Sequence, residues 1–291
     1  MLPFRRILFP VDYSKPCEAM IPFIKDLMHQ SEEAVQFTVQ LTLVHAYGPE
    51  ALAYSELPIA DPEIAAETQA MQEERLHEFA GRLFEGQPAT CVAACGEPGS
   101  VIHTVAQSQS SDLVMLPTHG RGPVRRFLLG SVTTKVLHDV SAAVWTGTEA
   151  ALAGHASNLP YRSILCALDG SPESECVLRA AAAFANLYGA ALSLLSIVEP
   201  MPATEFDMMP YQQDRIEAAH FHLRELAGGL GLNVTRNVLE APVADGVSRE
   251  AARLGADLVI AGRGHAQGVF TTLRSHLYQI VREAPCPVLS I

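Results

Sequence analysis

The chain has 291 residues, of which 48% are hydrophobic, and carries a formal net charge of −12 at pH 7. This length suits two domains of about 145 residues better than one core, and no apolar run reaches the 18 or more residues that a membrane helix needs. The negative charge argues against broad contact with nucleic acid or anionic lipid. We therefore expect no nucleic-acid or membrane partner, and any anionic ligand must be held by a local site.

The N-terminal residues, Met1 to Arg6, lead straight into a strand-like run and lack the long apolar region of an export signal. The six cysteines are scattered, and the spacing of Cys91 and Cys95 suits neither a redox pair nor a zinc site. We therefore expect a cytoplasmic protein whose thiols are reduced and packed as small hydrophobic groups.

Strand-like apolar runs alternate with helical spacing along the first half of the chain. The expected elements are, in order, a strand at 6–12, a helix over 20–28, a strand at 39–45, a helix over 64–83, a strand at 90–95, a short helix around 101–105, a strand at 112–116, a helix at 132–137 and a strand at 142–145. The stretch 47–62 is too rich in proline and small residues to predict regular structure.

The second half repeats this order, which predicts two copies of one domain. Its strands are expected at 162–169, 192–198, 234–239, 257–261 and 285–291, with helices beginning near Ser171 and spanning 216–230. The expected domains are therefore 1–147 and 161–291. Residues 148–160 are small and polar enough to form a linker between them.

Strands that alternate with helices form parallel α/β units with right-handed crossovers. Each half is therefore predicted to be a doubly wound five-strand parallel sheet with helices on both faces. Ligands in this architecture bind beyond the carboxyl ends of the strands, where the strand order reverses. Asp12 follows the first strand and a glycine-bearing loop, 117–131, follows the fourth, so both should lie at this edge.

The loop leads directly into a predicted helix, so it should present unpaired backbone N–H groups and the positive end of the helix dipole, which favour phosphate. Gly120 and Gly130 leave room for close approach, and Ser131 either caps the helix or donates its hydroxyl to an anion. We expect Gly130→Val to block an anion there while barely changing the fold.

Several charged residues near the loop have two possible interpretations, a ligand contact or a role without a ligand. Asp12 is either part of the ligand site or a turn acid, and His119 is either a phosphate donor or an exposed histidine without a role. Arg121 is the first candidate among the arginines for a phosphate contact, followed by Arg125 and Arg126; each is otherwise surface charge.

These residues together carry a resemblance to a known family. The run Ile7-Leu8-Phe9-Pro10-Val11-Asp12-Tyr13-Ser14, combined with Thr118-His119-Gly120, nine residues, and then Gly130-Ser131-Val132, resembles the universal stress protein family in its tandem form. The resemblance covers nearly the whole chain in two copies. It implies two Rossmann-like domains of the adenine-nucleotide alpha-hydrolase type, and ATP or another adenine nucleotide with Mg²⁺ as the cofactor.

The resemblance also implies which residues form the site in the first domain. Those expected near adenine and ribose are Pro10, Val11, Asp12 and Val44, and those expected around the phosphates are His119, Gly120, Arg121, Gly130, Ser131, Val132 and Thr133. Leu116, at the end of the fourth strand, is also expected in the nucleotide site. No catalytic residue and no metal ligand of the chain is assigned. Slow ATP hydrolysis stays open.

Both copies depart from the family pattern Gly-x2-Gly-x9-Gly-[Ser/Thr]. In the first copy, Pro117 takes the place of the first glycine and removes a backbone donor. In the second copy, the positions fall on Gly262, His265, Ser275 and His276, so the backbone cradle is lost. We therefore expect one nucleotide per chain, in the first domain only.

The expected function is that of an ATP-binding stress or signalling protein whose output is a conformation or a partner. The alternative is a tandem stress protein that binds no nucleotide and acts as an interaction module. A ligase or pyrophosphatase of related fold is disfavoured, because Val11-Asp12-Tyr13-Ser14 replaces the Ser-Gly-Gly-x-Asp-Ser loop of those enzymes and no Walker A motif is present.

The fifth strand of each half is an apolar edge that needs a partner. We expect residues 142–146 and 287–291 to pair within the chain as a pseudo-dimer, as the family resemblance implies. A homodimer of chains is the open alternative.

Overall fold

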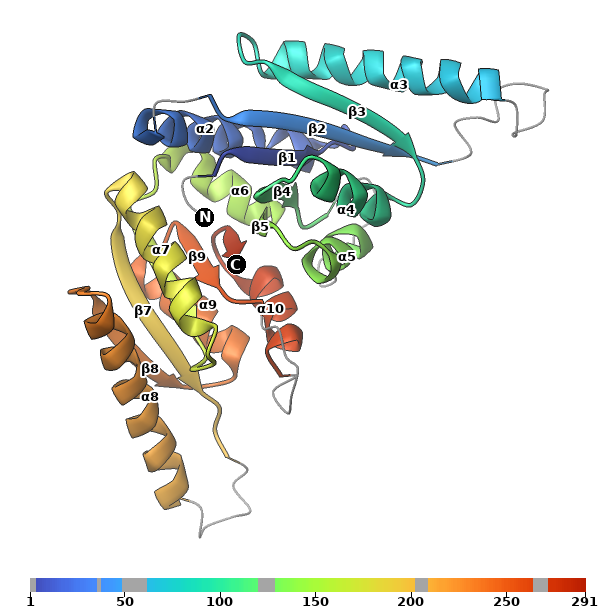
Figure 1. Ribbon diagram of the computed structural model, residues 1–291. Helices are drawn as coiled ribbons and strands as arrows, with labels where there is room; N and C mark the ends of the chain where they lie inside the picture. The colour runs from blue at the N-terminus through green and yellow to red at the C-terminus, as the bar shows by residue number, and fades with distance from the viewer. Residues whose placement is uncertain (1–3, 36–37, 49–61, 120–128, 202–208, 264–271) are drawn as a thin grey trace. The chain divides into compact units, whose positions relative to one another are not determined.

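The computed structural model describes residues 4–35, 38–48, 62–119, 129–201, 209–263 and 272–291 (Figure 1). The chain forms two compact units that divide between Trp145 and Thr146, and each is described by itself. The expected irregular stretch after Tyr47 lies mostly outside the described residues.

The first unit contains the alternating elements that the sequence predicts. They are β1 (Arg6–Pro10), α1 (Lys15–Glu18), α2 (Ile21–Val35), β2 (Gln40–Tyr47), α3 (Pro62–Leu83), β3 (Ala89–Cys95), α4 (Pro98–Ser108), β4 (Leu113–Pro117), α5 (Ser131–Asp139) and β5 (Ala143–Gly147), within which the division between the units falls.

The second unit repeats this order after a short helical segment. Its elements are α6 (Glu149–His155), the 3-10 turn η2 (Ala156–Asn158), β6 (Ser163–Leu168), α7 (Ser174–Tyr188), β7 (Ala191–Val198), α8 (Met209–Gly229), β8 (Thr235–Glu240), α9 (Val243–Leu254), β9 (Leu258–Ala261), α10 (Thr272–Glu283) and β10 (Val288–Ser290).

The strand order is β3-β2-β1-β4-β5 in the first unit and β10-β9-β6-β7-β8 in the second. β1 pairs in parallel with both β2 and β4, and β6 pairs in parallel with both β7 and β9. The order reverses between these strands, so right-handed crossovers place the early and the late helices of each unit on opposite faces of the sheet. This is the predicted doubly wound fold. α3 packs on β2 and β3, and α8 packs on β7 and β8 (Figure 1).

The central strands have continuous apolar sequences because helices cover both faces of the sheet. β4 is buried along its whole length, and Leu8 and Phe9 of β1 are fully buried. Trp145 of β5 is also buried, with its ring centroid 5.0 Å from that of Phe23 on α2. The core thus fixes where the carboxyl ends of β1, β2 and β4 lie.

The segment expected to be a linker contains a helix. The Thr148 hydroxyl accepts from the amide of Ala151 at 3.2 Å and caps α6, which buries Ala151 and Leu152. An alanine-rich run behind a threonine cap is a helix signal that the small-residue composition concealed.

The cysteines follow the expectation in part. Cys17, Cys166 and Cys286 are buried as small hydrophobic groups, whereas Cys95 and Cys176 are exposed, so the expectation of packed thiols is wrong for these two.

Among the described residues, no helix has the length and hydropathy of a membrane span.

Candidate functional site

The carboxyl ends of β1, β2 and β4 meet at one edge of the first unit. Pro10 lies opposite Val44, and the amide of Val11 donates to the Val44 carbonyl at 2.8 Å. Leu8 lies opposite Val114 in the parallel pair, so the carboxyl end of β4 lies at this edge beside that of β1. The candidate site is therefore at the point where the strand order reverses, the usual ligand position in this fold.

Asp12 forms a tight turn directly after β1. One carboxylate oxygen, Oδ1, accepts from the amide of Ser14 at 3.0 Å, and Ser14 in turn caps α1 by accepting from the amide of Cys17 at 3.2 Å. The Asp12 side chain is half-buried, and this turn uses one of its two carboxylate oxygens. Among the described residues, Asp12 thus makes a turn and still has an oxygen available to a ligand.

The two ends of the loop after β4 are tied together by hydrogen bonds. The amide of Gly130 donates to the Thr118 carbonyl at 3.0 Å. The buried Thr133 hydroxyl donates to the carbonyls of Pro117 and Thr118 at 3.0 and 3.2 Å. These bonds hold the start of α5 against the end of β4. Because its hydroxyl is engaged in this way, Thr133 can offer a phosphate only its backbone amide.

Gly130 is held so closely that no side chain fits. A Cβ on this residue would lie 2.8 Å from the Thr118 carbonyl oxygen, which is backbone and cannot move aside cheaply. The expectation that Gly130→Val would barely change the fold is therefore wrong. The glycine is required by the closure of the loop, whatever occupies the site.

α5 begins without a side-chain cap. Gly130 is its N-cap residue, and the first helical hydrogen bond runs from the amide of Thr134 to the Gly130 carbonyl at 2.9 Å. The amides of Ser131, Val132 and Thr133 therefore have no acceptor within the helix. Ser131 is the first helical residue and is exposed, so it does not cap the helix. Three oriented N–H groups at the positive end of a helix dipole form an anion-binding surface.

The loop histidine lies next to this surface. His119 Nδ1 and the Thr118 hydroxyl are 3.0 Å apart. Four residues of the sequence-based prediction, Gly120, Arg121, Arg125 and Arg126, lie outside the described residues.

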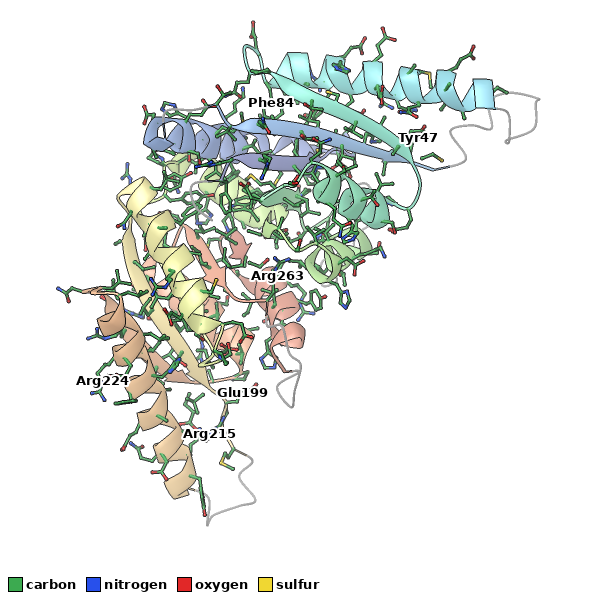
Figure 2. All side chains as sticks on the ribbon, in the orientation of Figure 1. Tyr47, Phe84, Glu199, Arg215, Arg224 and Arg263 are labelled. Carbon is green, nitrogen blue, oxygen red and sulfur yellow. The ribbon has the colours of Figure 1, made fainter. Side chains whose placement is uncertain are left out.

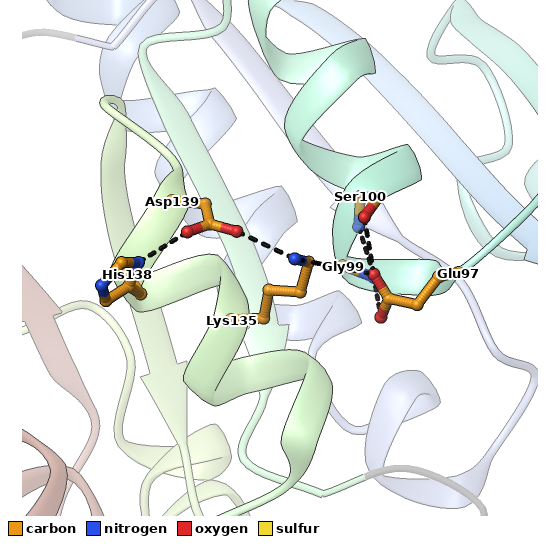
Figure 3. A network of polar contacts seen from close by, with 6 residues as sticks. All are labelled: Glu97, Gly99, Ser100, Lys135, His138 and Asp139. Carbon is orange, nitrogen blue, oxygen red and sulfur yellow. Dashed lines mark hydrogen bonds and ion pairs between the residues drawn. The ribbon is translucent and has the colours of Figure 1, made fainter.

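A surface network connects the far end of α5 to the start of α4 (Figure 3). Glu97 caps α4 by accepting from the amides of Gly99 and Ser100 at 2.9 and 2.8 Å. Lys135 Nζ lies 3.9 Å from this carboxylate and 3.1 Å from that of Asp139. The Lys135 chain covers Gly99, where a Cβ would lie 2.5 Å from Lys135 Cδ. The network therefore fixes α5 relative to α4.

The same contacts shift the pKa values of both acids. Burial alone would raise the pKa of Glu97, but hydrogen bonds from Gly99 and Ser100 and the charge of Lys135 outweigh it and lower the pKa. Hydrogen bonds from His138 and Lys135 lower the pKa of Asp139. Both groups are therefore held as carboxylates at neutral pH.

The structure adds residues to the site that sequence reasoning missed. His45 Nδ1 is 2.7 Å from the Val11 carbonyl, and the Tyr13 ring packs on His45 with 4.8 Å between centroids. From α3, Phe79 meets Tyr13 edge-on at 5.4 Å, and the Arg75 guanidinium lies 4.2 Å above the Tyr13 ring. The only sequence signal was that Tyr13 adjoins Asp12; nothing in the sequence links Tyr13 to Arg75 and Phe79, which lie more than 60 positions later.

In the second unit, the helix that corresponds to α5 begins at a different position. α10 starts at Thr272, four residues before His276, whereas α5 starts at Ser131 itself, the residue aligned with His276. His276 Nε2 is 4.0 Å from the carboxylate of Glu199, which follows β7. Arg263, labelled in Figure 2, is buried, and burial lowers its pKa to about 10. The aligned amide thus lies inside a helix, and the His276 side chain faces an acid.

The turn after β6 keeps the geometry of the turn after β1. Asp169 Oδ1 accepts from the amide of Ser171 at 3.0 Å, and also from the hydroxyls of Ser171 and Ser174 at 2.7 and 3.0 Å.

The described members of the predicted site in the first unit lie on neighbouring segments of one sheet edge. They are Pro10, Val11, Asp12, Val44, Leu116, His119, Gly130, Ser131, Val132 and Thr133. Val44 and Leu116 are buried and form its floor.

Two doubly wound α/β units in tandem, each with a turn acid at the strand-order reversal, define a duplicated domain of the Rossmann-like class. The model of the universal stress protein family matches residues 3–146 and, separately, residues 160–291. The chain therefore belongs to the universal stress protein family.

Individual relatives agree with this assignment. A universal stress protein of Mycolicibacterium smegmatis is 27% identical over 302 aligned positions, which cover 98% of this chain and 96% of the relative. A universal stress protein of Mycobacterium tuberculosis is 34% identical over 108 residues, covering 37% of this chain and 35% of the relative. The crystal structure of a universal stress protein from Archaeoglobus fulgidus has a TM-score of 0.68 at 18% identity and covers 98% of this chain and 95% of its own. The last comparison supports the fold.

Proposed function

We propose that this chain is an ATP-binding stress-response or signalling protein that holds one adenine nucleotide in its first domain. The observation that carries the proposal is the start of α5, where three successive amides lack a helical acceptor beside the ends of β1 and β4. Phosphate is the usual guest of such a helix start. Membership of the universal stress protein family supports the same reading.

In this proposal the edge of the sheet divides into two parts. Pro10, Val11 and Asp12 take the adenine and ribose, with Val44 beneath them. The amides of Ser131, Val132 and Thr133, together with His119, Gly120 and Arg121, take the phosphates. Among the described residues, no group of three His, Cys, Asp or Glu side chains could hold a metal by itself. We therefore assign Mg²⁺ to the phosphates of the nucleotide.

The output of the proposed nucleotide site is a conformation or a partner in the cytoplasm. We also propose that the two fifth strands pair within the chain, as the tandem repeat suggests. Sedimentation of the full chain separates this arrangement from a homodimer: a monomer at micromolar concentration supports pairing inside one chain, and a stable dimer supports pairing between chains.

The binding proposal is tested by titration calorimetry with Mg·ATP on the wild type and on Ser131→Asp. An acid at the first helical position suits the helix dipole, so the fold should keep its melting temperature. The added carboxylate occupies the phosphate position, so binding should be abolished. Gln109→Glu, at the C-terminal end of α4, adds the same charge at the opposite edge of the sheet and should bind like wild type.

Two results would contradict the proposal. Wild-type protein that shows no binding of any adenine nucleotide would favour the alternative of an interaction module. Unchanged affinity in Ser131→Asp would place the nucleotide elsewhere in the chain.

A further inference from the structure

The backbone of Tyr13 has the left-handed conformation that favours glycine. Its φ is 60°, and the equivalent residue of the second unit, Gly170, has φ 79°. The two turns are otherwise alike, because in both an aspartate Oδ1 accepts from the serine amide two residues later at 3.0 Å. Glycine meets this conformation without strain, whereas a side chain there costs about 1 kcal/mol or more. The first unit nevertheless carries a tyrosine.

Three contacts hold the Tyr13 ring in this strained position. The ring lies against His45 of β2, meets Phe79 of α3 edge-on, and has the Arg75 guanidinium 4.2 Å from its centre. His45 is itself tied to the Val11 carbonyl at 2.7 Å. The ring therefore connects the turn after β1 to the adjacent strand and to α3.

The two units fix their turn acids in different ways. Asp169 is held by two serine hydroxyls in addition to an amide, so its Oδ1 is fully engaged. In the part of the chain that the structure describes, the Asp12 carboxylate accepts from one amide, that of Ser14. Gly170 has no ring of its own, and the side chain nearest to a Cβ there would be the imidazole of His222, at 3.7 Å. The carboxylate of Asp12 is therefore fixed by fewer of its own hydrogen bonds than that of Asp169, and the contacts of the Tyr13 ring hold its turn in their place.

We infer that Tyr13 is a positioning residue, which fixes the carboxylate of Asp12 by anchoring its turn to Arg75 and Phe79 of α3. This inference rests on the proposed function. α3 is then coupled to the proposed nucleotide site through Arg75 and Phe79, which contact the Tyr13 ring. Nucleotide affinity depends on the docking of α3, and binding in turn strengthens that docking, because a coupling between two sites is reciprocal.

The test compares Tyr13→Gly with Tyr13→Phe and Phe79→Ala in the full chain. Tyr13→Gly copies the turn of the second unit and relieves the backbone strain, so the melting temperature should change little. Its affinity for Mg·ATP should fall about tenfold, which is the effect of about 1.4 kcal/mol. Tyr13→Phe keeps the ring and should bind like wild type. Phe79→Ala should weaken binding in the same direction, and the double variant Tyr13→Gly with Phe79→Ala should bind no worse than Tyr13→Gly alone.

Hydrogen exchange at the Ser14 amide gives a second readout that needs no nucleotide. This amide donates to Asp12, so its exchange should speed up in Tyr13→Gly and in Phe79→Ala, and stay slow in Tyr13→Phe. A wild-type Kd and unchanged Ser14 exchange in Tyr13→Gly would overturn the inference. So would a lower melting temperature with an unchanged Kd, since the ring would then serve stability alone. Absence of binding in the wild type would instead remove the proposed function, while the Ser14 exchange would still judge the anchoring.

Discussion

The amide of Gly130 donates to the Thr118 carbonyl at 3.0 Å, and a Cβ on Gly130 would lie 2.8 Å from the same oxygen. One contact therefore closes the loop and excludes a side chain at the residue where α5 starts. The family pattern describes this glycine as part of a nucleotide site, but the geometry gives it a structural role as well. A variant at Gly130 cannot separate binding from folding, which is why Ser131 is the better position for a test of binding.

Gly130→Ala should destabilise the protein. The added methyl group must push the Thr118 carbonyl away and stretch the bond that closes the loop, at roughly 1–3 kcal/mol. Chemical denaturation measures this loss. The matched control is Gly81→Ala in α3, where a Cβ meets nothing within 4 Å. That change should stabilise by roughly 0.5–1 kcal/mol, because alanine is the better helix former. Equal stability of the two variants would show that Gly130 is not confined as described.

Thr133→Val should loosen the loop at its other anchor. The buried hydroxyl donates to the carbonyls of Pro117 and Thr118, and valine leaves both without this donor at similar side-chain volume. We expect a loss of roughly 1–2 kcal/mol in the free energy of unfolding, together with weaker nucleotide binding. Thr133→Ser retains the hydroxyl and should keep most of the stability and most of the nucleotide affinity. A Thr133→Val protein with wild-type stability would contradict the role of this hydroxyl.

The sequence predicted the parts of the site that depend on local pattern. The apolar run at 112–116 and the glycine before Ser131 were enough to place a strand, a loop and a helix start. Contacts across the fold left no such signal: Arg75 and Phe79 look like any residues of an amphipathic helix until α3 is docked on Tyr13. α6 was missed for another reason, since small residues suit both a linker and a helix, and only the Thr148 cap and the burial of Leu152 distinguish them.

The ion-pair network on α4 and α5 should make stability depend on acid pH. The folded-state pKa of Glu97 lies below its ordinary value of 4.5, so its stabilising contribution is fully present above that pH. The contribution is lost as the pH falls through the lowered pKa of the folded state. Glu97→Gln should remove roughly 0.5 kcal/mol at neutral pH, a small amount because the group is half-exposed.

Melting temperatures measured from pH 7 to pH 3 check this dependence. The wild type and Glu97→Gln should differ at neutral pH and converge as the pH falls through the lowered pKa of Glu97. Glu85→Gln, which changes an exposed acid just after α3, serves as the control and should follow the wild type throughout. A constant difference between wild type and Glu97→Gln across the whole range would contradict the charged role of Glu97.

The last prediction is that the chain binds one nucleotide, in the first domain. The reason lies in where the two corresponding helices begin. Ser131 is the first residue of α5, so its amide points out of the helix, whereas His276 stands four residues inside α10 and its amide is used by the helix. The carboxylate of Glu199 also lies 4.0 Å from the His276 ring and would repel a phosphate.

These differences are large enough to remove a site. Losing two charge-assisted hydrogen bonds at roughly 1.5–3 kcal/mol each converts a micromolar site into one near the millimolar range. Titration calorimetry with Mg·ATP should therefore give a stoichiometry near one, and Ser131→Asp should leave no measurable heat. Glu199→Gln removes the acid but leaves the start of α10 unchanged, so its stoichiometry should stay near one. A value of two in Glu199→Gln would show that the charge alone closes the second site, and a value of two in the wild type would show that the helix start does not decide which domain binds.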